Sequence, residues 1–227
     1  MVISFDGACK GNGTPECMSV GACVTDDLTF STRTETLEST NQRGELNGAI
    51  SALTKASITD ELVYIVTDSE FIFNSINKEW CLSWPIKNWL TSMGDPIKNQ
   101  DQWSQIVDIL QSIDIDRITM IYIKGHVLPY TKLQAAKDLS IAIKSDAGWD
   151  IDYTLKPNIE ALYNAIETKF DEYYKNNAHK VIKCYDTTVR INGYDLDAKL
   201  FKKCVCLNMI TDLIAGLKLD KVVNSSK

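Results

Sequence analysis

The sequence predicts an α/β protein in which helices flank a mixed sheet. Between residues 2 and 32, three short apolar runs follow one another at hairpin-like distances, which is typical of an opening meander of strands. Beyond residue 40, runs rich in β-branched side chains alternate with segments whose apolar residues recur at helical spacing. Strands that alternate with helices after a meander indicate an α/β layer with a mixed sheet.

Five strands are expected. The meander supplies the first three, with Asp26 and Asp27 as turn residues between the second and the third. The other two are continuous apolar runs, as expected for strands that are covered on both faces. The expected strands span residues 2–5, 20–25, 28–32, 62–66 and 118–123.

The helices follow from apolar spacing and capping residues. A first helix should begin at the capping residues Ser-Thr-Asn at 39–41 and a second just beyond Asp68. The other helices are expected at 101–113, 158–174 and 198–217, the last ending at or near Gly216. Residues 125–157 have no firm assignment, and 181–195 are ambiguous between strand and loop, with a turn at Asn192-Gly193.

Composition indicates an ordinary globular chain of one or two domains, since its 227 residues are 44% hydrophobic and 24% charged. No apolar run approaches the roughly 18 residues of a membrane span, and the first residues lack the features of a signal peptide. The seven cysteines are odd in number and lack CxxC spacing, which argues against a disulfide framework and a zinc site. We therefore expect a cytoplasmic protein with reduced thiols and no membrane partner.

The net charge of −6 is unusual for a nucleic-acid binder, because phosphate neutralisation normally demands a basic surface. An enzyme that collects carboxylates around divalent cations escapes this rule, since the metal ions carry the positive charge locally. The charge alone therefore decides neither way.

Three acids are expected at comparable positions of the fold. Asp6 should end the first strand, Asp68 a later strand, and Glu45 should lie in the first turns of the helix between them. Carboxylates that converge at one sheet edge repel one another and need protons or cations between them. Oxygen ligands favour Mg²⁺ or Mn²⁺, and two such ions about 3.5–4 Å apart serve in-line displacement at phosphorus.

Each acid alone has an ordinary explanation. Asp6 could cap the turn before Gly7, Glu45 could be a solvated helix residue, and Asp68 could be a helix N-cap. It is the three together, each within its own motif, that favour a metal site.

Four segments carry a family resemblance: FDGACKGNG, STNQRGELNGAISAL, YIVTDSEFI and IYIKGH. In their order and nearly in their spacing, they resemble the successive signatures of type I ribonuclease H, and PIKNQDQWSQIVDIL resembles the family's tryptophan-bearing helix. The resemblance covers residues 2–126 almost continuously. It implies a ribonuclease H-like sheet of five strands, three antiparallel and then parallel, flanked by helices.

The resemblance also implies an activity: hydrolysis of the RNA strand of an RNA/DNA hybrid, leaving a 5′-phosphate and a 3′-hydroxyl, commonly in DNA replication. Two Mg²⁺ ions, or Mn²⁺, would be held by Asp6 between them and by Glu45 and Asp68. Gly7 and Gly11 would let the nucleic-acid backbone approach. His126 would assist proton transfer or product departure, unless it is a capping histidine.

Further positions match the residues with which the family holds its substrate. The residues that would contact the minor groove of the hybrid are Cys9, Asn12, Asn41 and Gln42. Phosphate contact would fall to Thr40 and Arg43. For each, the alternative is a loop or cap residue without a ligand. The segment where the family carries a basic protrusion has only Lys78, Lys87 and Lys98 as basic residues, so we expect hybrid binding to be weak and salt-dependent.

The fourth carboxylate of the family has two candidates. Asp138 is nearer to the usual distance from His126, whereas Asp212 keeps Asn208 and Ala215 at the family's offsets. Asn208 and Asp212 are four residues apart and share a helix face. We therefore expect Asp212 to be the fourth metal ligand, with Asp138 as the alternative.

This choice divides the chain into a catalytic core at 1–126 plus 198–220, an inserted helical or irregular segment at 127–197, and a tail at 221–227. A monomer is expected. A 3′–5′ exonuclease on a related fold is a rival interpretation, but it would show an Asp-x-Glu pair on the first strand, which FDGACK lacks. A second rival interpretation is a non-catalytic module that binds a hybrid or a protein partner. Such a module would be expected to have lost one of the acids.

Overall fold

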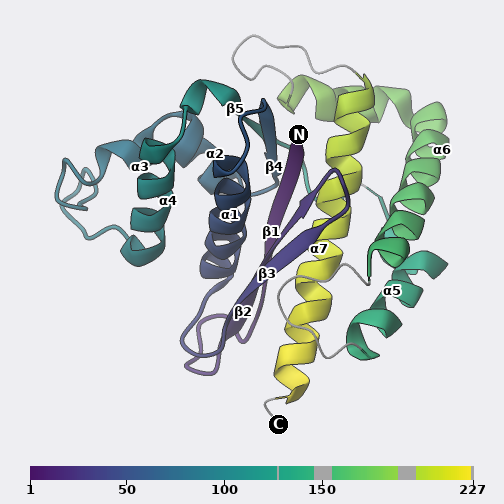
Figure 1. The fold of residues 1–227 in the computed structure, drawn as a ribbon, viewed down its shortest axis with the longest axis horizontal. Helices are drawn as coiled ribbons and strands as arrows, with labels where there is room; N and C mark the ends of the chain where they lie inside the picture. Colours follow the sequence, from purple (N-terminus) through teal and green to yellow (C-terminus); the bar gives the residue numbers. More distant parts are fainter. Residues whose placement is uncertain (127, 146–154, 189–197, 226–227) are drawn as a thin grey trace.

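A computed structural model of the chain describes residues 1–126, 128–145, 155–188 and 198–225. Its centre is a five-stranded sheet of order β3-β2-β1-β4-β5 (Figure 1). The first three strands pair antiparallel, and β4 and β5 continue the sheet in parallel with β1. The predicted fold class is therefore confirmed. The strands are β1 (Val2–Lys10), β2 (Met18–Thr25), β3 (Phe30–Glu35), β4 (Val63–Thr67) and β5 (Ile118–Tyr122).

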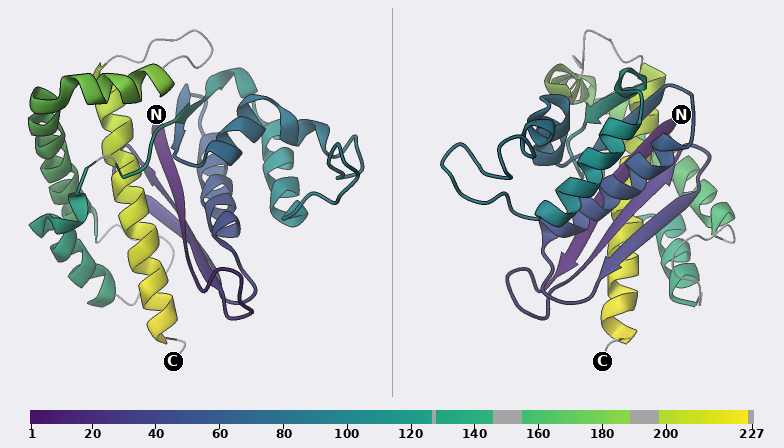
Figure 2. Two further views of the ribbon diagram at one scale, coloured as in Figure 1. Left: turned by 180° about the vertical axis from the view of Figure 1, so that it is seen from behind. Right: turned by 60° about the vertical axis from the view of Figure 1, so that its left-hand side comes forward.

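Helices cover both faces of the sheet (Figures 1 and 2). One face is covered by α1 and α4, with α2 and α3 beside them, and the other by α7, with α5 and α6 outside it. The helices are α1 (Asn41–Ser57), α2 (Glu70–Asn77), α3 (Trp80–Ser83), α4 (Gln100–Ser112), α5 (Gln134–Ser145), α6 (Lys156–Thr188) and α7 (Ala198–Ser225). Two short 3-10 helices complete the described elements, η1 (Ile115–Arg117) and η2 (Tyr130–Lys132).

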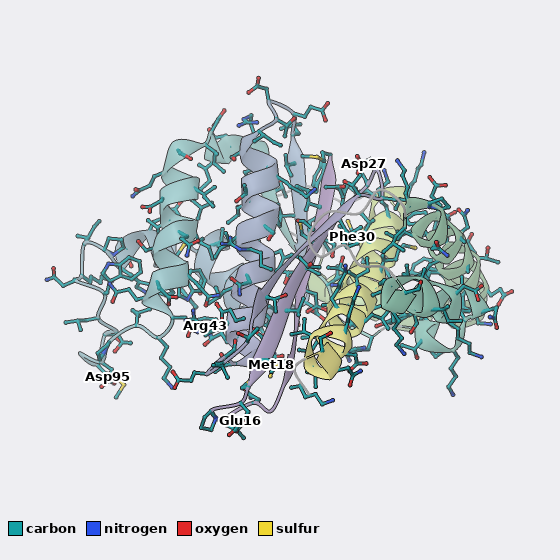
Figure 3. The ribbon with its side chains drawn as sticks, turned by 60° about the horizontal axis from the view of Figure 1, so that its bottom comes forward. Glu16, Met18, Asp27, Phe30, Arg43 and Asp95 are labelled. Carbon is teal, nitrogen blue, oxygen red and sulfur yellow. The ribbon has the colours of Figure 1, made fainter. Side chains whose placement is uncertain are left out.

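The sheet separates two apolar cores, and strand β1 contributes alternately to both. Ile3 and Phe5 pack toward α1 and α4, while Val2 packs toward α7. On the α7 side, Phe30 of β3 belongs to the same core as the middle of α7, and Met18 lies at the carboxyl-terminal end of that helix (Figure 3). By the same alternation, Asp6 faces the side of the sheet that α7 covers.

The expectation that β1 ends at Asp6 is wrong. The strand continues to Lys10, and Asp6 lies opposite Ala22 in the antiparallel ladder with β2. The parallel pairing with β4 stops earlier, at Ser4 opposite Val66. Beyond this point β1 is paired on one side only, so Asp6 lies where β1 and β4 separate.

Close backbone contact holds α1 on the sheet. A Cβ atom on Gly21 of β2 would lie 2.2 Å from the amide nitrogen of Gly48, and one on Gly7 would lie 2.2 Å from the amide nitrogen of Glu45. The absence of a side chain at Gly7 therefore makes room for helix α1, and the expected approach of a nucleic-acid backbone at Gly7 stays a prediction. Gly11 has a φ of +80° and serves the turn after β1.

The region after β5 differs most from expectation. Unassigned residues of 125–157 form η2 and α5, and the helix expected at 158–174 runs from Lys156 to Thr188. Residues 181–188 are therefore helical, neither strand nor loop, and Asn192-Gly193 lies outside the described residues.

Helix α7 does not end near Gly216 but continues to Ser225, so residues 221–225 are not a tail. An isolated glycine costs a helix only about 1 kcal/mol. Beyond it, Leu219 and Val222 are buried against Val20 of β2, which favours continuation of the helix. Among the described helices, none has the length and apolar composition that crossing a membrane requires.

The glycine contacts predict opposite effects of two alanine substitutions. Gly21→Ala should destabilise the fold by about 3 kcal/mol or more, because its Cβ meets backbone that cannot move alone. Gly216→Ala should instead stabilise it by about 0.5–1 kcal/mol, since nothing lies within 4 Å of a Cβ there. Urea unfolding measures both; a Gly21→Ala variant as stable as the wild type would contradict the close contact.

Candidate active site

Four carboxylates from separate elements gather where β1 and β4 part. Asp6 comes from β1, Glu45 from the first turns of α1, Asp68 from the residue after β4, and Asp212 from α7. Asp6 is the centre of the group, with only 7% of its surface exposed. Burial raises the pKa of Asp6 well above its usual value, and the charges of Asp68, Asp212 and, more weakly, Glu45 raise it further. The Gly7 amide donates a hydrogen bond of 2.6 Å to Asp6 Oδ1, which opposes this shift.

Asp68 is held against the chain that follows β5. Burial and then the charge of Asp212 raise its pKa, while His126 acts in the opposite direction. A Cβ atom on Gly125 would lie 2.1 Å from Asp68 Oδ2, so any other residue here would force the Asp68 carboxylate to move. The sequence analysis missed this role of Gly125, although a glycine three residues after the end of a buried strand was a usable signal.

Glu45 is held by two hydrogen bonds. Ser69 Oγ donates to Oε2 at 2.6 Å, and Asn41 Nδ2 donates to Oε1 at 3.0 Å. Burial raises the pKa of Glu45, the bond from Ser69 lowers it, and Asp68 raises it again. Ser69 was not predicted as a site residue, and it connects the acid of α1 to the turn that carries Asp68.

Asp212 lies beside two groups from the segment after β5. Tyr130 donates its hydroxyl hydrogen to Asp212 Oδ2, and His126 Nδ1 lies 3.4 Å from the same oxygen. One helical turn earlier, Asn208 is buried, and its Nδ2 has no hydrogen-bond partner among the described residues. Tyr130 was not predicted from the sequence.

Asp138, the alternative fourth carboxylate, lies elsewhere. It is exposed on α5 and accepts a hydrogen bond of 2.8 Å from Gln134 Nε2. Its charge is not among those that shift the pKa of Asp6 or Asp68, whereas the charge of Asp212 shifts both. The structure thus brings Asp212, and not Asp138, to the other acids.

The expected groove-reading residues lie around the amino terminus of α1, and each contacts a neighbouring polar or sulfur atom of the protein. Asn12 Oδ1 accepts from the Asn41 amide at 3.3 Å, and Gln42 Oε1 accepts from Asn99 Nδ2 at 3.0 Å. Cys9 Sγ lies 3.7 Å from Cys17 Sγ, and burial together with this contact raises the pKa of Cys9 to about 11. The Cys9 thiol is therefore neutral at physiological pH.

The two expected phosphate contacts border an open groove of about 600 Å³ between β3 and α1. Thr40 is the N-cap of α1 and accepts from the Arg43 amide at 3.1 Å. The Arg43 guanidinium is already bound to Glu35 and Asp101, each at 2.7 Å (Figure 3). Its charge is thus largely compensated within the protein.

The donor set fits hard divalent cations in its chemistry. Four carboxylates supply oxygen ligands alone, and the crowded charge around Asp6 calls for a cation or a proton. In the part of the chain that the structure describes, no three His, Cys, Asp or Glu side chains yet surround one point. Glu45 is instead held by Asn41 and Ser69, and Asp212 by Tyr130.

The repulsion around Asp6 predicts that Asp6→Asn stabilises the metal-free protein. A raised pKa means that wild-type stability falls as pH rises from the usual carboxyl value of 3.8 through the folded-state pKa. At pH 7 with EDTA, the melting temperature of Asp6→Asn should exceed that of the wild type by at least about 2–4 °C, the shift that 1 kcal/mol produces in a chain of this length. This gain in melting temperature should shrink toward pH 4. Asp138→Asn is the control, because Asp138 is exposed and its substitution should leave the melting temperature unchanged. A loss of stability at pH 7 would contradict the repulsion.

Comparison with known proteins identifies the family. The model of the RNase H family matches residues 1–131, more than half of the chain. Ribonuclease HI of Pseudomonas putida is 33% identical over 125 residues, 54% of this chain and 78% of the relative. Ribonuclease H of Chlorobium phaeobacteroides is 32% identical over 130 residues, covering 56% and 83%.

Among solved structures, the RNase H domain of PFV aligns at 22% identity with a TM-score of 0.43, covering 55% of this chain and 79% of that domain. The sequence motifs, the family model and the curated relatives agree over the same part of the chain. This protein therefore belongs to the RNase H family.

Proposed function

We propose that this protein hydrolyses the RNA strand of RNA/DNA hybrids in a reaction that needs two divalent metal ions, leaving a 5′-phosphate and a 3′-hydroxyl. The observation that carries the proposal is the gathering of Asp6, Asp68 and Asp212 at the opening between β1 and β4, with Glu45 beside them. The curated relatives, which are named ribonuclease H, support it. Bound Mg²⁺ or Mn²⁺ would activate water and stabilise the leaving 3′-oxygen.

In this proposal Asp6 would hold both ions, with Asp68, Glu45 and Asp212 completing their ligands. Hydrogen bonds from Ser69 and Tyr130 would hold Glu45 and Asp212 in place for this role. His126 is 75% exposed and lies 3.4 Å from Asp212, so its ring can turn between the acids and solvent. We assign it proton transfer or assistance to product departure.

For the substrate, we propose that Cys9, Asn12, Asn41 and Gln42 read the minor groove, where a hybrid displays 2′-hydroxyl groups on one strand only. Support comes from their position around the amino terminus of α1, beside Glu45. Thr40 and Arg43 would contact a phosphate in the adjoining groove. Because Glu35 and Asp101 compensate its charge, Arg43 should contribute less to affinity than a free arginine.

We further propose that residues 1–126 and 198–220 form the catalytic core, with 127–197 inserted into it. The family match ends at residue 131, and α7 then returns to pack on β1 and β2. Within the inserted part, α5 and α6 pack on α7 and share its apolar core. The insertion would thus thicken the layer on one face of the sheet.

A labelled 20-base-pair hybrid tests the activity. With Mg²⁺, the RNA strand should be cut at internal positions, and EDTA should abolish cutting. Single-stranded RNA and duplex DNA should be spared, and duplex RNA should be a poor substrate. Stepwise loss from the 3′ end would instead indicate an exonuclease, tight binding without cleavage a non-catalytic module, and equal rates on single-stranded RNA would contradict the groove-reading residues.

Paired substitutions test the fourth acid. Asp212→Asn should lower Mg²⁺-dependent cleavage by about 100-fold or more, because it removes a ligand charge from the cluster. Asp138→Asn should stay within about twofold of the wild type, since its carboxylate is exposed and contacts Gln134. Unfolding curves of both variants control for stability; the reverse pattern would place the fourth ligand on α5.

A further inference from the structure

Tyr130 reaches the carboxylate cluster from the last residues that the family model matches, just before the insertion continues into α5. It begins η2, between β5 and α5, and its side chain is only 3% exposed. Its ring lies in the apolar core on the α7 side of the sheet. A buried tyrosine needs a partner for its hydroxyl, and here the partner is Asp212 Oδ2, 82 residues further along the chain.

We propose that Tyr130 is a positioning residue that fixes the Asp212 carboxylate through Oδ2, so that Oδ1 is presented to the metal-binding side of the cluster. Acids that bind metal ions are commonly oriented by a hydrogen bond to the oxygen that does not bind. Among the described residues, Asp212 Oδ1 has no hydrogen-bond partner, whereas Oδ2 lies against both Tyr130 and His126.

Of these two neighbours, Tyr130 is the better suited to hold the Asp212 carboxylate in place. Its backbone is fixed on both sides, since its amide donates to the Leu128 carbonyl at 2.9 Å and its carbonyl accepts from the Leu133 amide at 3.0 Å. His126 is 75% exposed, and its Nδ1 is 3.4 Å from Oδ2. A buried, unionised donor can therefore hold the acid while the histidine moves.

The order of elements along the chain explains why a hydrogen bond between Tyr130 and Asp212 is useful. In the sequence, α5 and α6 lie between β5 and α7, so no short connection joins the end of β5 to the helix that carries Asp212. The Tyr130 hydroxyl instead ties the residues just after β5 directly to the acid on α7. The residues that begin the insertion thereby become part of the site.

This inference rests on the proposed function, and metal binding without nucleic acid tests it separately. Calorimetric titration of Mn²⁺ into the full chain should give a Kd about 10-fold weaker for Tyr130→Phe than for the wild type. Phenylalanine keeps the buried ring, so the unfolding midpoint without metal should change little; titrations are run about 20 °C below each variant's midpoint. Tyr163→Phe is the matched control, because Tyr163 packs against the same core but makes none of the hydrogen bonds that hold the four acids of the cluster, and its Kd should equal that of the wild type.

Equal Mn²⁺ affinity of Tyr130→Phe and wild type would overturn the inference, as would no Mn²⁺ binding by the wild type. Tighter binding by Tyr130→Phe would also overturn it, because the hydroxyl would then compete with the metal. In the cleavage assay, the variant should need about 10-fold more Mn²⁺ for half its maximal rate, with the maximal rate itself within about threefold. If the wild type binds Mn²⁺ but cuts no hybrid, the proposed function is wrong. The comparison of Kd values still tests whether Tyr130 positions Asp212 for metal binding.

Discussion

The structure depends on one burial that is unfavourable by itself: the carboxylate of Asp6 lies in the central strand of the sheet, close to three other acids. Removing a carboxylate from water disfavours its charge, and neighbouring negative charges add to that penalty. Within the described ranges, the one hydrogen bond that opposes this penalty comes from the Gly7 amide. Such a centre is retained in a fold when a cation or a proton resolves the conflict, which is why the site and its chemistry follow from this residue.

The surrounding elements hold the other acids at a fixed relation to Asp6. Contact of α1 with β1 and β2 through glycine backbone places Glu45 at the strand where Asp6 lies. Gly125 leaves room for Asp68. On the face of the sheet that α7 covers, Tyr130 donates a hydrogen bond to Asp212. Each acid is thus positioned by a packing or hydrogen-bonding contact from a different part of the chain.

Much of this could be predicted from the sequence, because the signals were local. The meander and the alternation of strands and helices predicted the sheet, and three of the four acids lie within motifs that are informative as an ordered set. Strand β1 was predicted too short, since its second half carries small and polar residues and is stabilised by pairing with β2, not by an apolar pattern. Helix α5 was missed although Ala136, Leu139 and Ile143 are spaced for a helix, because turn signals precede them.

What sequence alone could not show are contacts between distant residues. The partner of Tyr130 is 82 residues away, and that of Ser69 is 24 residues away, so no local pattern marks either hydroxyl as part of a site. The length of α7 was likewise underestimated, because Gly216 is a usual helix stop and the burial of Val222 against β2 is a tertiary effect. The candidate metal-binding acids were therefore easier to predict from the sequence than the residues that hold them in position.

The most direct test of the account is anomalous diffraction from crystals of the wild-type chain soaked in Mn²⁺, because it locates the ions without relying on activity. The account predicts manganese peaks at about 2.1–2.3 Å from the carboxylate of Asp6, shared with Asp68 and with Glu45 or Asp212. Manganese bound only at other acids, with Asp6 uncoordinated at saturating Mn²⁺, would contradict it.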